Sequence, residues 1–246
     1  SLTILHVAKD REEHVPWHDY PAVRDTLERW GHLPEGASRH DVVKELGIDV
    51  EKTVGFDKNV VKSIVDFTQL NDFDLIVMAT NENREHPFWM HDSVSVPVSE
   101  GAHLPTLCVP HDVPGCVAPE TGAVSLDQVV VPVDHQPDSH PVLERIAWTM
   151  DKFGGPEANV ALLHVGDEHT FPRVSPPDEG SFVWSKVTRS GSAANQITDV
   201  AKELGADLIA MVTEGQKGFW DEIRGITVQQ VLKHETCPLF TITAKA

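Results

Sequence analysis

Three blocks of the sequence recur in the same order in its second part, and this internal repeat is the strongest constraint on the fold. The matching blocks are LTILHVAKD (2–10) with VALLHVGDE (160–168), VVKSIVDFTQLNDFDLIVMATNE (60–82) with AANQITDVAKELGADLIAMVTEG (193–215), and DSVSVPVSEGAHLPTLCV (92–109) with GITVQQVLKHETCPLFTI (225–242). The first pair is offset by 158 residues and the other two pairs by 133. Because ordered self-similarity marks a repeated structural unit, the sequence predicts a duplicated domain.

Each half alternates apolar strand patterns with helical patterns, which indicates an α/β fold. In the second half the expected strands are 128–134, 159–165, 182–187, 207–212 and 238–243, and the expected helices are 141–154, 193–205 and 227–235. Continuous apolar runs such as QVVVPVD are typical of parallel strands that are covered on both faces. The sequence therefore predicts two flavodoxin-like, or Rossmann-like, domains, each built on an open parallel sheet.

The domain boundary is expected at a segment rich in proline and glycine, PHDVPGCVAPETGAVSLD (110–127). We therefore predict a first domain at 1–110, a linker at 111–126 and a second domain at 127–246. The first half begins at the counterpart of the second strand, so its first strand and first helix are missing. The second half has only 17 residues (166–182) after its second strand, where the first half has a helical pattern at 21–31, so it has lost that helix.

Composition and charge exclude several classes of protein. The formal net charge of −18 argues against nucleic acid or an anionic membrane surface as the main partner, since both require basic patches. No apolar run reaches 18 residues, so no membrane span is expected. The three cysteines have no CxxC spacing, and the sequence begins without a signal-peptide pattern. These features predict a cytoplasmic protein without a zinc finger.

The runs VVVPVD, LLHV, GADLIAM, the glycine-containing loop and VLKHETCPLFTI resemble the universal stress protein family. The resemblance implies two domains of about five parallel strands, packed as a pseudo-dimer inside one chain; a further homodimer stays open. It also implies stress-linked binding or regulation without evident catalysis. The sequence has neither a G-x-S-x-G elbow nor a P-loop, so a hydrolase or kinase lacks support, although weak ATPase activity stays open. Since the first strand is central in this fold, residues 1–109 alone should not form an intact five-stranded sheet.

Nucleotide-binding members of the family carry the motif G-x2-G-x9-G-[ST] after the fourth strand. In the second half the motif positions fall on Val212, Gly215, Gly225 and Ile226, with Thr227 one residue late. The resemblance also implies an acidic residue at the end of the first strand, which here is Asp134; its alternative role is to cap the following turn. An adenine nucleotide site for ATP or AMP with Mg²⁺ would use Asp134, Gly215, Gly218, Gly225 and Thr227.

The corresponding positions of the first half do not fit a nucleotide. They are Ala79, Glu82, Asp92 and Ser93, so two carboxylates replace the central glycines. Charge repulsion at short range predicts that the first half does not bind ATP in the manner of the family.

A histidine-based site for a divalent metal is the third hypothesis. His135 follows the first strand of the second half, and His164 and His169 lie at the end of the second strand. Because neighbouring parallel strands end at the same edge of a sheet, these imidazoles could converge on Zn²⁺. His164 also matches His6 of the first half, which favours a structural role with Nδ1–H bonded to the backbone.

Overall fold

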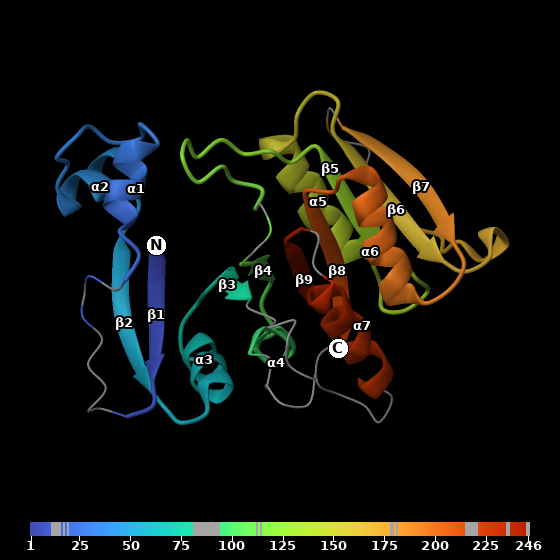
Figure 1. The fold of residues 1–246 in the computed structure, drawn as a ribbon, viewed down its shortest axis with the longest axis horizontal. Helices are drawn as coiled ribbons and strands as arrows, with labels where there is room; N and C mark the ends of the chain where they lie inside the picture. Colours follow the sequence, from blue (N-terminus) through green and yellow to red (C-terminus); the bar gives the residue numbers. More distant parts are fainter. Residues whose placement is uncertain are drawn as a thin grey trace. The chain divides into compact units, whose positions relative to one another are not determined.

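The computed structural model describes residues 1–10, 16, 18, 20–80, 94–111, 113, 115–177, 180, 182–214, 221–234 and 237–244. The chain divides into two compact units (Figure 1). Unit 1 contains Ser1–Asp72 and Ala118–Ala123, and unit 2 contains Phe73–Val117 and Val124–Ala246. No helix among the described residues combines the length and apolarity that crossing a bilayer requires.

Unit 1 has a two-stranded parallel sheet and three short helices. The strands are β1 (Leu2–Ala8) and β2 (Val50–Phe56), and the helices are α1 (Val23–Arg29), α2 (Arg39–Leu46) and α3 (Val60–Gln69). A capping box begins α2. The Ser38 side chain accepts a hydrogen bond from the backbone N–H of Asp41, and the Asp41 carboxylate accepts one from the backbone N–H of Ser38. Gly47, at φ 67°, ends α2 in the left-handed conformation that glycine adopts without steric cost.

Unit 2 is built on a seven-stranded sheet of order β3-β4-β9-β8-β5-β6-β7. The strands are β3 (Ile76–Thr80), β4 (Thr106–Pro110), β5 (Gln128–Pro132), β6 (Asn159–Val165), β7 (Val183–Arg189), β8 (Leu208–Glu214) and β9 (Leu239–Ala244). The helices are α4 (Ser95–Gly101), α5 (His140–Phe153), α6 (Ala193–Leu204) and α7 (Asp221–Lys233), with a 3₁₀ turn η3 (Glu168–Thr170). All strand pairs are parallel except β4–β9, which is antiparallel.

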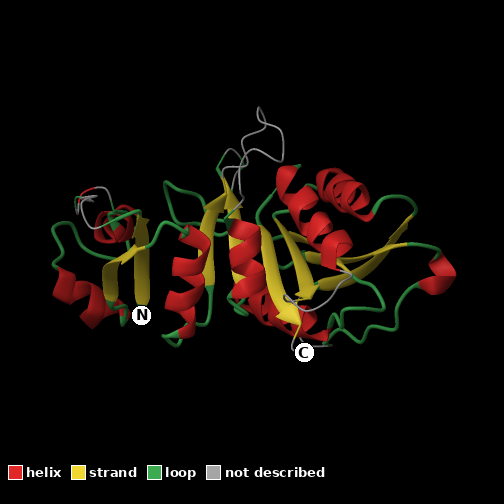
Figure 2. Cartoon of the chain, turned by 90° about the horizontal axis from the view of Figure 1, so that it is seen from below, coloured by secondary structure: helices red, strands yellow, loops and turns green. Residues whose placement is uncertain are grey.

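Helices cover both faces of this sheet (Figure 2). Alternate residues of β5 belong to two separate core clusters: Val130 lies in the cluster that contains residues of α6 and α7, and Val129 and Val131 lie in the cluster that contains residues of α5. Since successive side chains of a strand point to opposite faces, α5 lies on one face and α6 and α7 lie on the other. The predicted doubly covered parallel α/β sheet is confirmed.

The described residues of 1–109 do not form an intact five-stranded sheet, which agrees with the expectation. Their strands divide between two sheets: β1 and β2 pair in unit 1, and β3 and β4 join the larger sheet. In unit 2, β6 and β8, which are the counterparts of β1 and β3, both pair with β5. The compact units therefore differ from the predicted boundaries, because β4 pairs with β9 and residues 118–123 of the expected linker contact unit 1.

Several elements recur with the offset found in the sequence. The strand β2 begins 133 residues before β7, the helix α3 133 residues before α6, and the strand β4 133 residues before β9. The pairs β3–β4 and β8–β9 also have the same register, since Ile76 pairs with Thr106 and Ile209 with Leu239. This recurrence is what a duplicated domain predicts. Between β6 and β7 the described residues form only η3, in agreement with the predicted loss of a helix.

Candidate functional site

A hollow of about 550 Å³ lies at the carboxyl ends of β5 and β6 in unit 2. Its lining is polar on the side that follows β5 and mixed on the side that follows β6: Asp134, His135, Gln136, Asp138, Ser139, His169, Thr170, Phe171, Pro172, Arg173 and Val174. The two segments meet because β5 and β6 are adjacent parallel strands that end at the same edge. Ligands of open α/β sheets bind at this edge.

Asp134 lies at the place that the sequence predicted and has the capping role that was its alternative. Its Oδ1 accepts the backbone N–H of His135 at 2.7 Å, which fixes the turn after β5. Asp138 does the same one turn later, where Oδ1 accepts the N–H of His140 at 3.0 Å. Both carboxylates also line the hollow, so capping holds two negative charges at its edge.

Thr170 connects the histidines of this site. The Nε2 of His135 lies 3.0 Å from the carbonyl oxygen of Thr170, and the Nε2 of His164 lies 3.1 Å from its hydroxyl oxygen. The same hydroxyl donates to the carbonyl oxygen of Asp167 at 2.7 Å. These bonds hold η3 against the ends of β5 and β6. The Thr170 hydroxyl and the imidazoles of His135 and His164 therefore have a structural role.

The structural role expected for His164 is confirmed. Its side chain is buried, and Nδ1 lies 3.3 Å from the backbone carbonyl oxygen of Val133. Its ring also packs edge-on against Phe171, with 5.6 Å between ring centroids. Both ring nitrogens of this buried imidazole lie within hydrogen-bond distance of protein atoms, which fits a structural role.

The three predicted metal ligands do not assemble into a metal centre. The described residues contain no group of three or more histidine, cysteine, aspartate or glutamate side chains arranged to hold an ion. The rings of His135 and His164 are 6.3 Å apart, but Thr170 engages a nitrogen of each. His169 lines the hollow on η3 without joining them in a metal-binding group. The hydrogen bonds to Thr170 give His135 and His164 a protein partner at one nitrogen each.

The predicted phosphate loop is only partly within the described residues. Gly215 and Gly218 lie outside them, whereas Gly225 and Thr227 lie in α7, which begins at Asp221. The free N–H groups of a helix are its first four, so the amide of Gly225 lies beyond them. This differs from the expectation that Gly225 stands at a helix start.

In the first half, Ala79 lies on β3, and the other three motif positions, Glu82, Asp92 and Ser93, lie outside the described residues. The segment that sequence reasoning missed is 170–174, which together with the predicted His169 supplies one wall of the hollow and includes Arg173. Its signal was available: the segment directly follows β6, whose end had to lie beside the end of β5.

Unit 2 is an open α/β sheet with a hollow at the carboxyl edge of its central strands. Residues 178–242 match the model of the universal stress protein family, in agreement with the resemblance of the sequence. No curated protein matches the chain.

Two solved structures have a similar fold. A universal stress protein from Archaeoglobus fulgidus DSM 4304 has 17% identity and a TM-score of 0.62, over 99% of this chain and 86% of the other. A protein from Pseudomonas aeruginosa UCBPP-PA14, assigned as a universal stress protein, has 16% identity and a TM-score of 0.56, over 98% and 92%. The similarity extends across both halves of the chain and concerns the fold.

Proposed function

We propose that the chain is a cytoplasmic stress-response protein that acts by binding a small polar ligand in unit 2, without a catalytic step. The hollow at the ends of β5 and β6 carries the proposal, because open α/β sheets bind their ligands at this edge. Its lining includes the carboxylate of Asp134, the imidazole of His135 and the guanidinium of Arg173, which can orient a ligand that both donates and accepts hydrogen bonds.

An adenine nucleotide is the ligand that we propose to test first. Asp134 supports it, since a carboxylate at the end of this strand can accept from ribose hydroxyls or from an amino group. Gly225, the motif glycine within the described residues, lies inside α7, so its amide is not among the free N–H groups that a phosphate chain would need. We therefore expect adenosine and AMP to bind more tightly than ATP with Mg²⁺.

Calorimetric titration of EDTA-treated protein with adenosine, AMP and ATP with Mg²⁺ tests this proposal. Asp134→Asn should weaken adenosine and AMP binding by about tenfold, the amount that one charged hydrogen bond contributes. Asp199→Asn makes the same charge change at an exposed position of α6 and should leave the affinity unchanged. Absence of heat with all three compounds would contradict the nucleotide ligand, and ATP turnover lost in Asp134→Asn would contradict the non-catalytic role.

We also propose that the two halves of the chain form an intramolecular pseudo-dimer. The antiparallel pairing of β4 with β9, which are counterparts in the two halves, supports it: Leu107 pairs with Phe240 and Thr106 with Thr241. Such a pairing of equivalent edge strands is the contact that a two-fold arrangement of two similar sheets produces.

A further inference from the structure

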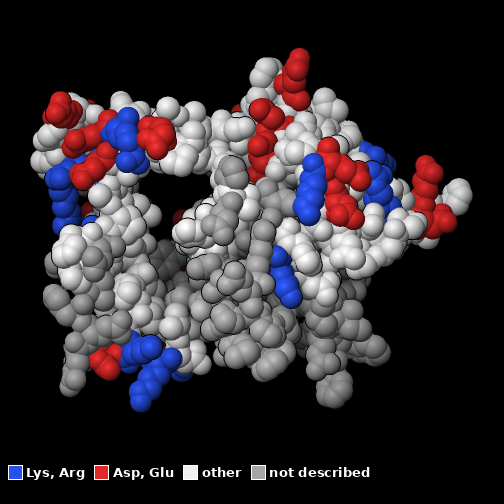
Figure 3. Space-filling model, in the orientation of Figure 1, with Lys and Arg blue, Asp and Glu red and all other residues white. Residues whose placement is uncertain are grey.

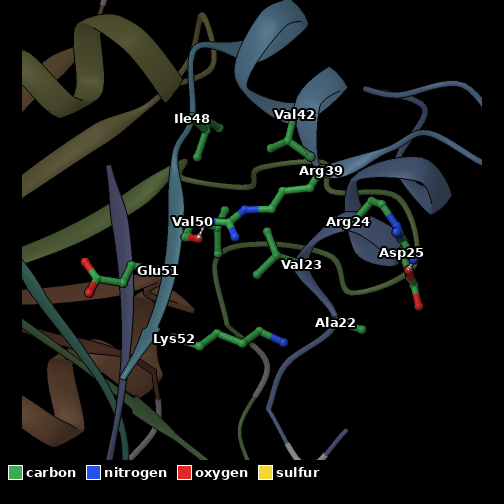
Figure 4. Close-up of a pocket in the computed structure, with 10 residues that line it drawn as sticks. All are labelled: Ala22, Val23, Arg24, Asp25, Arg39, Val42, Ile48, Val50, Glu51 and Lys52. Carbon is green, nitrogen blue, oxygen red and sulfur yellow. Dashed lines mark hydrogen bonds and ion pairs between the residues drawn. The ribbon is translucent and has the colours of Figure 1, made fainter. Parts of the chain in front are cut away.

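A second hollow, of about 590 Å³, lies within unit 1 and is separate from the site in unit 2. It is bounded by α1, α2 and the amino-terminal half of β2 (Figure 4). Its apolar lining comes from Val23, Val42, Ile48 and Val50, of which Val42 is buried and the others are half-buried. These side chains form an apolar wall that is partly open to solvent.

Strand alternation selects which charges face this hollow. Val50 and Lys52 lie on one side of β2, and Figure 4 shows the Glu51 side chain on the other side, directed away from them. Glu51 also lines the hollow, but its carboxylate points away from the Lys52 ammonium. The Nζ of Lys52 lies 5.6 Å from the centre of the Tyr20 ring, a cation–π contact that leaves its N–H donors available on the open side.

Arg39 supplies a second cation at the same wall. Its Nη2 donates to the carbonyl oxygen of Val50 at 3.1 Å, which anchors the guanidinium two residues along β2 from Lys52, roughly 7 Å by strand geometry. Its ion pair with Asp49 is long, at 3.7 Å, and exposed on both sides, so it neutralises little of the charge. The guanidinium has five N–H donors, and only one is used by Val50.

The third cation of the lining is already paired. Arg24 lies 3.3 Å from Asp25 and 3.7 Å from Glu28. Acidic and basic side chains alternate in this way over the helical part of unit 1 (Figure 3). Arg39 and Lys52 therefore place two cations at this wall of the hollow, in a chain whose formal charge is −18.

We propose that this hollow binds a small amphipathic carboxylate. The hydrocarbon part would cover Val23, Ile48 and Val50, and the carboxylate would lie between Arg39 and Lys52. Burial of alkyl groups on the apolar wall and charge-assisted hydrogen bonds to the two cations are complementary contributions of this ligand class. The site lies beside the amino-terminal half of β2, so it is independent of the carboxyl-edge site in unit 2 and of its proposed function.

Methyl NMR of the full chain tests the proposal, with octanoate as the probe and octan-1-ol as its uncharged match. We expect octanoate to produce a saturable shift of the Ile48 methyl signal, and octan-1-ol to bind at least about tenfold more weakly. Arg39→Gln and Lys52→Gln should each weaken octanoate binding by about tenfold. Lys44→Gln removes the same charge from an exposed position of α2 outside the lining and should change nothing.

Three outcomes would overturn the proposal. They are an Ile48 methyl signal that does not respond to octanoate, equal binding of octan-1-ol, and equal weakening by Lys44→Gln. Unchanged methyl signals of unit 2 in every variant show that the protein is folded, so a loss of binding can be assigned to the removed charge.

Discussion

The strands β3 and β8 have nearly the same sequence and the same pairing with the next strand, yet they differ in burial. Leu75 is 47% exposed and its counterpart Leu208 is 5% exposed; Val77 is 61% exposed and Ala210 is fully buried. The registers of β3–β4 and β8–β9 are identical. What differs is the other edge: β8 pairs there with β5, and no described strand pairs with that edge of β3.

This comparison separates two levels of structure. The local pattern DLIVMA or DLIAMV is enough to specify a strand and its register with the following strand. Burial of the same pattern requires a third strand and the helix that packs on it, which here are β5 and α5. Two copies of a sequence pattern therefore differ in how much they stabilise the fold when only one copy has a neighbouring strand and helix that cover it.

The largest expected effect is the difference between two leucine truncations. Leu208→Ala should lower the free energy of unfolding by about 2–5 kcal/mol, because it leaves a cavity in the α5 face of the core. Leu75→Ala should cost less than about 1 kcal/mol, because the side chain is largely exposed already. Urea unfolding followed by circular dichroism measures both. Equal losses would show that something covers the edge of β3 in solution.

The aspartates that precede these two leucines, Asp207 and Asp74, should differ less in their effect on stability. The Oδ2 of Asp207 accepts the backbone N–H groups of Asp127 at 2.8 Å and Gln128 at 3.0 Å, and so anchors the start of β5. Asp207→Ala should destabilise the protein by about 1–2 kcal/mol, since it leaves a half-buried N–H without its acceptor. The counterpart, Asp74→Ala, is at an exposed position and should stay within about 0.5 kcal/mol of the unsubstituted protein.

Hydrogen exchange of the Gln128 amide checks the mechanism of this second contrast. The exchange rate should rise in Asp207→Ala and stay the same in Asp74→Ala. An unchanged rate in Asp207→Ala would mean that the carboxylate does not hold the start of β5.

Much of this architecture could be predicted from the sequence, because it depends on local patterns. The recurrence of DLIVMA as DLIAMV, the helices at α3 and α6, and the backbone bond of His164 all follow from residue pattern and repeat. The pairing of β4 with β9 could not be predicted, since the residue pattern of an edge strand does not indicate which strand it pairs with. Because of this pairing, β3 and β4 belong to unit 2 and not to the unit that contains β1 and β2.

The candidate site was predicted less completely, for two physical reasons. Asp134 and His169 were expected at the strand ends, but the contacts of Thr170 with one imidazole nitrogen of His135 and one of His164 have no signal in the sequence pattern. The start of α7 at Asp221 was also missed, although aspartate and glutamate in a first turn are a common signal of a helix start. The helix was expected only from residue 227, because residues 215–225 were interpreted as a glycine loop.

The smallest expected effect concerns the thiol of Cys116. Burial raises the pKa of this half-buried thiol above its ordinary value of 9.0, and the charge of Asp207 raises it further. A thiol whose pKa is higher in the folded protein stays neutral at pH 7, and its contribution to stability is lost as the pH rises above 9.0. Asp207→Asn should therefore lower the pKa of Cys116, and Asp74→Asn should not.

Alkylation of Cys116 by iodoacetamide measures this pKa, because only the thiolate reacts. The rate, followed by peptide mass spectrometry across a pH series, should rise at a lower pH in Asp207→Asn than in the unsubstituted protein and in Asp74→Asn. The two variants make the same charge change at counterpart positions, so this experiment extends the comparison of β3 with β8 from packing to electrostatics. Identical pH profiles would show that the Asp207 charge is screened from the thiol, and would leave burial as the sole cause of the raised pKa.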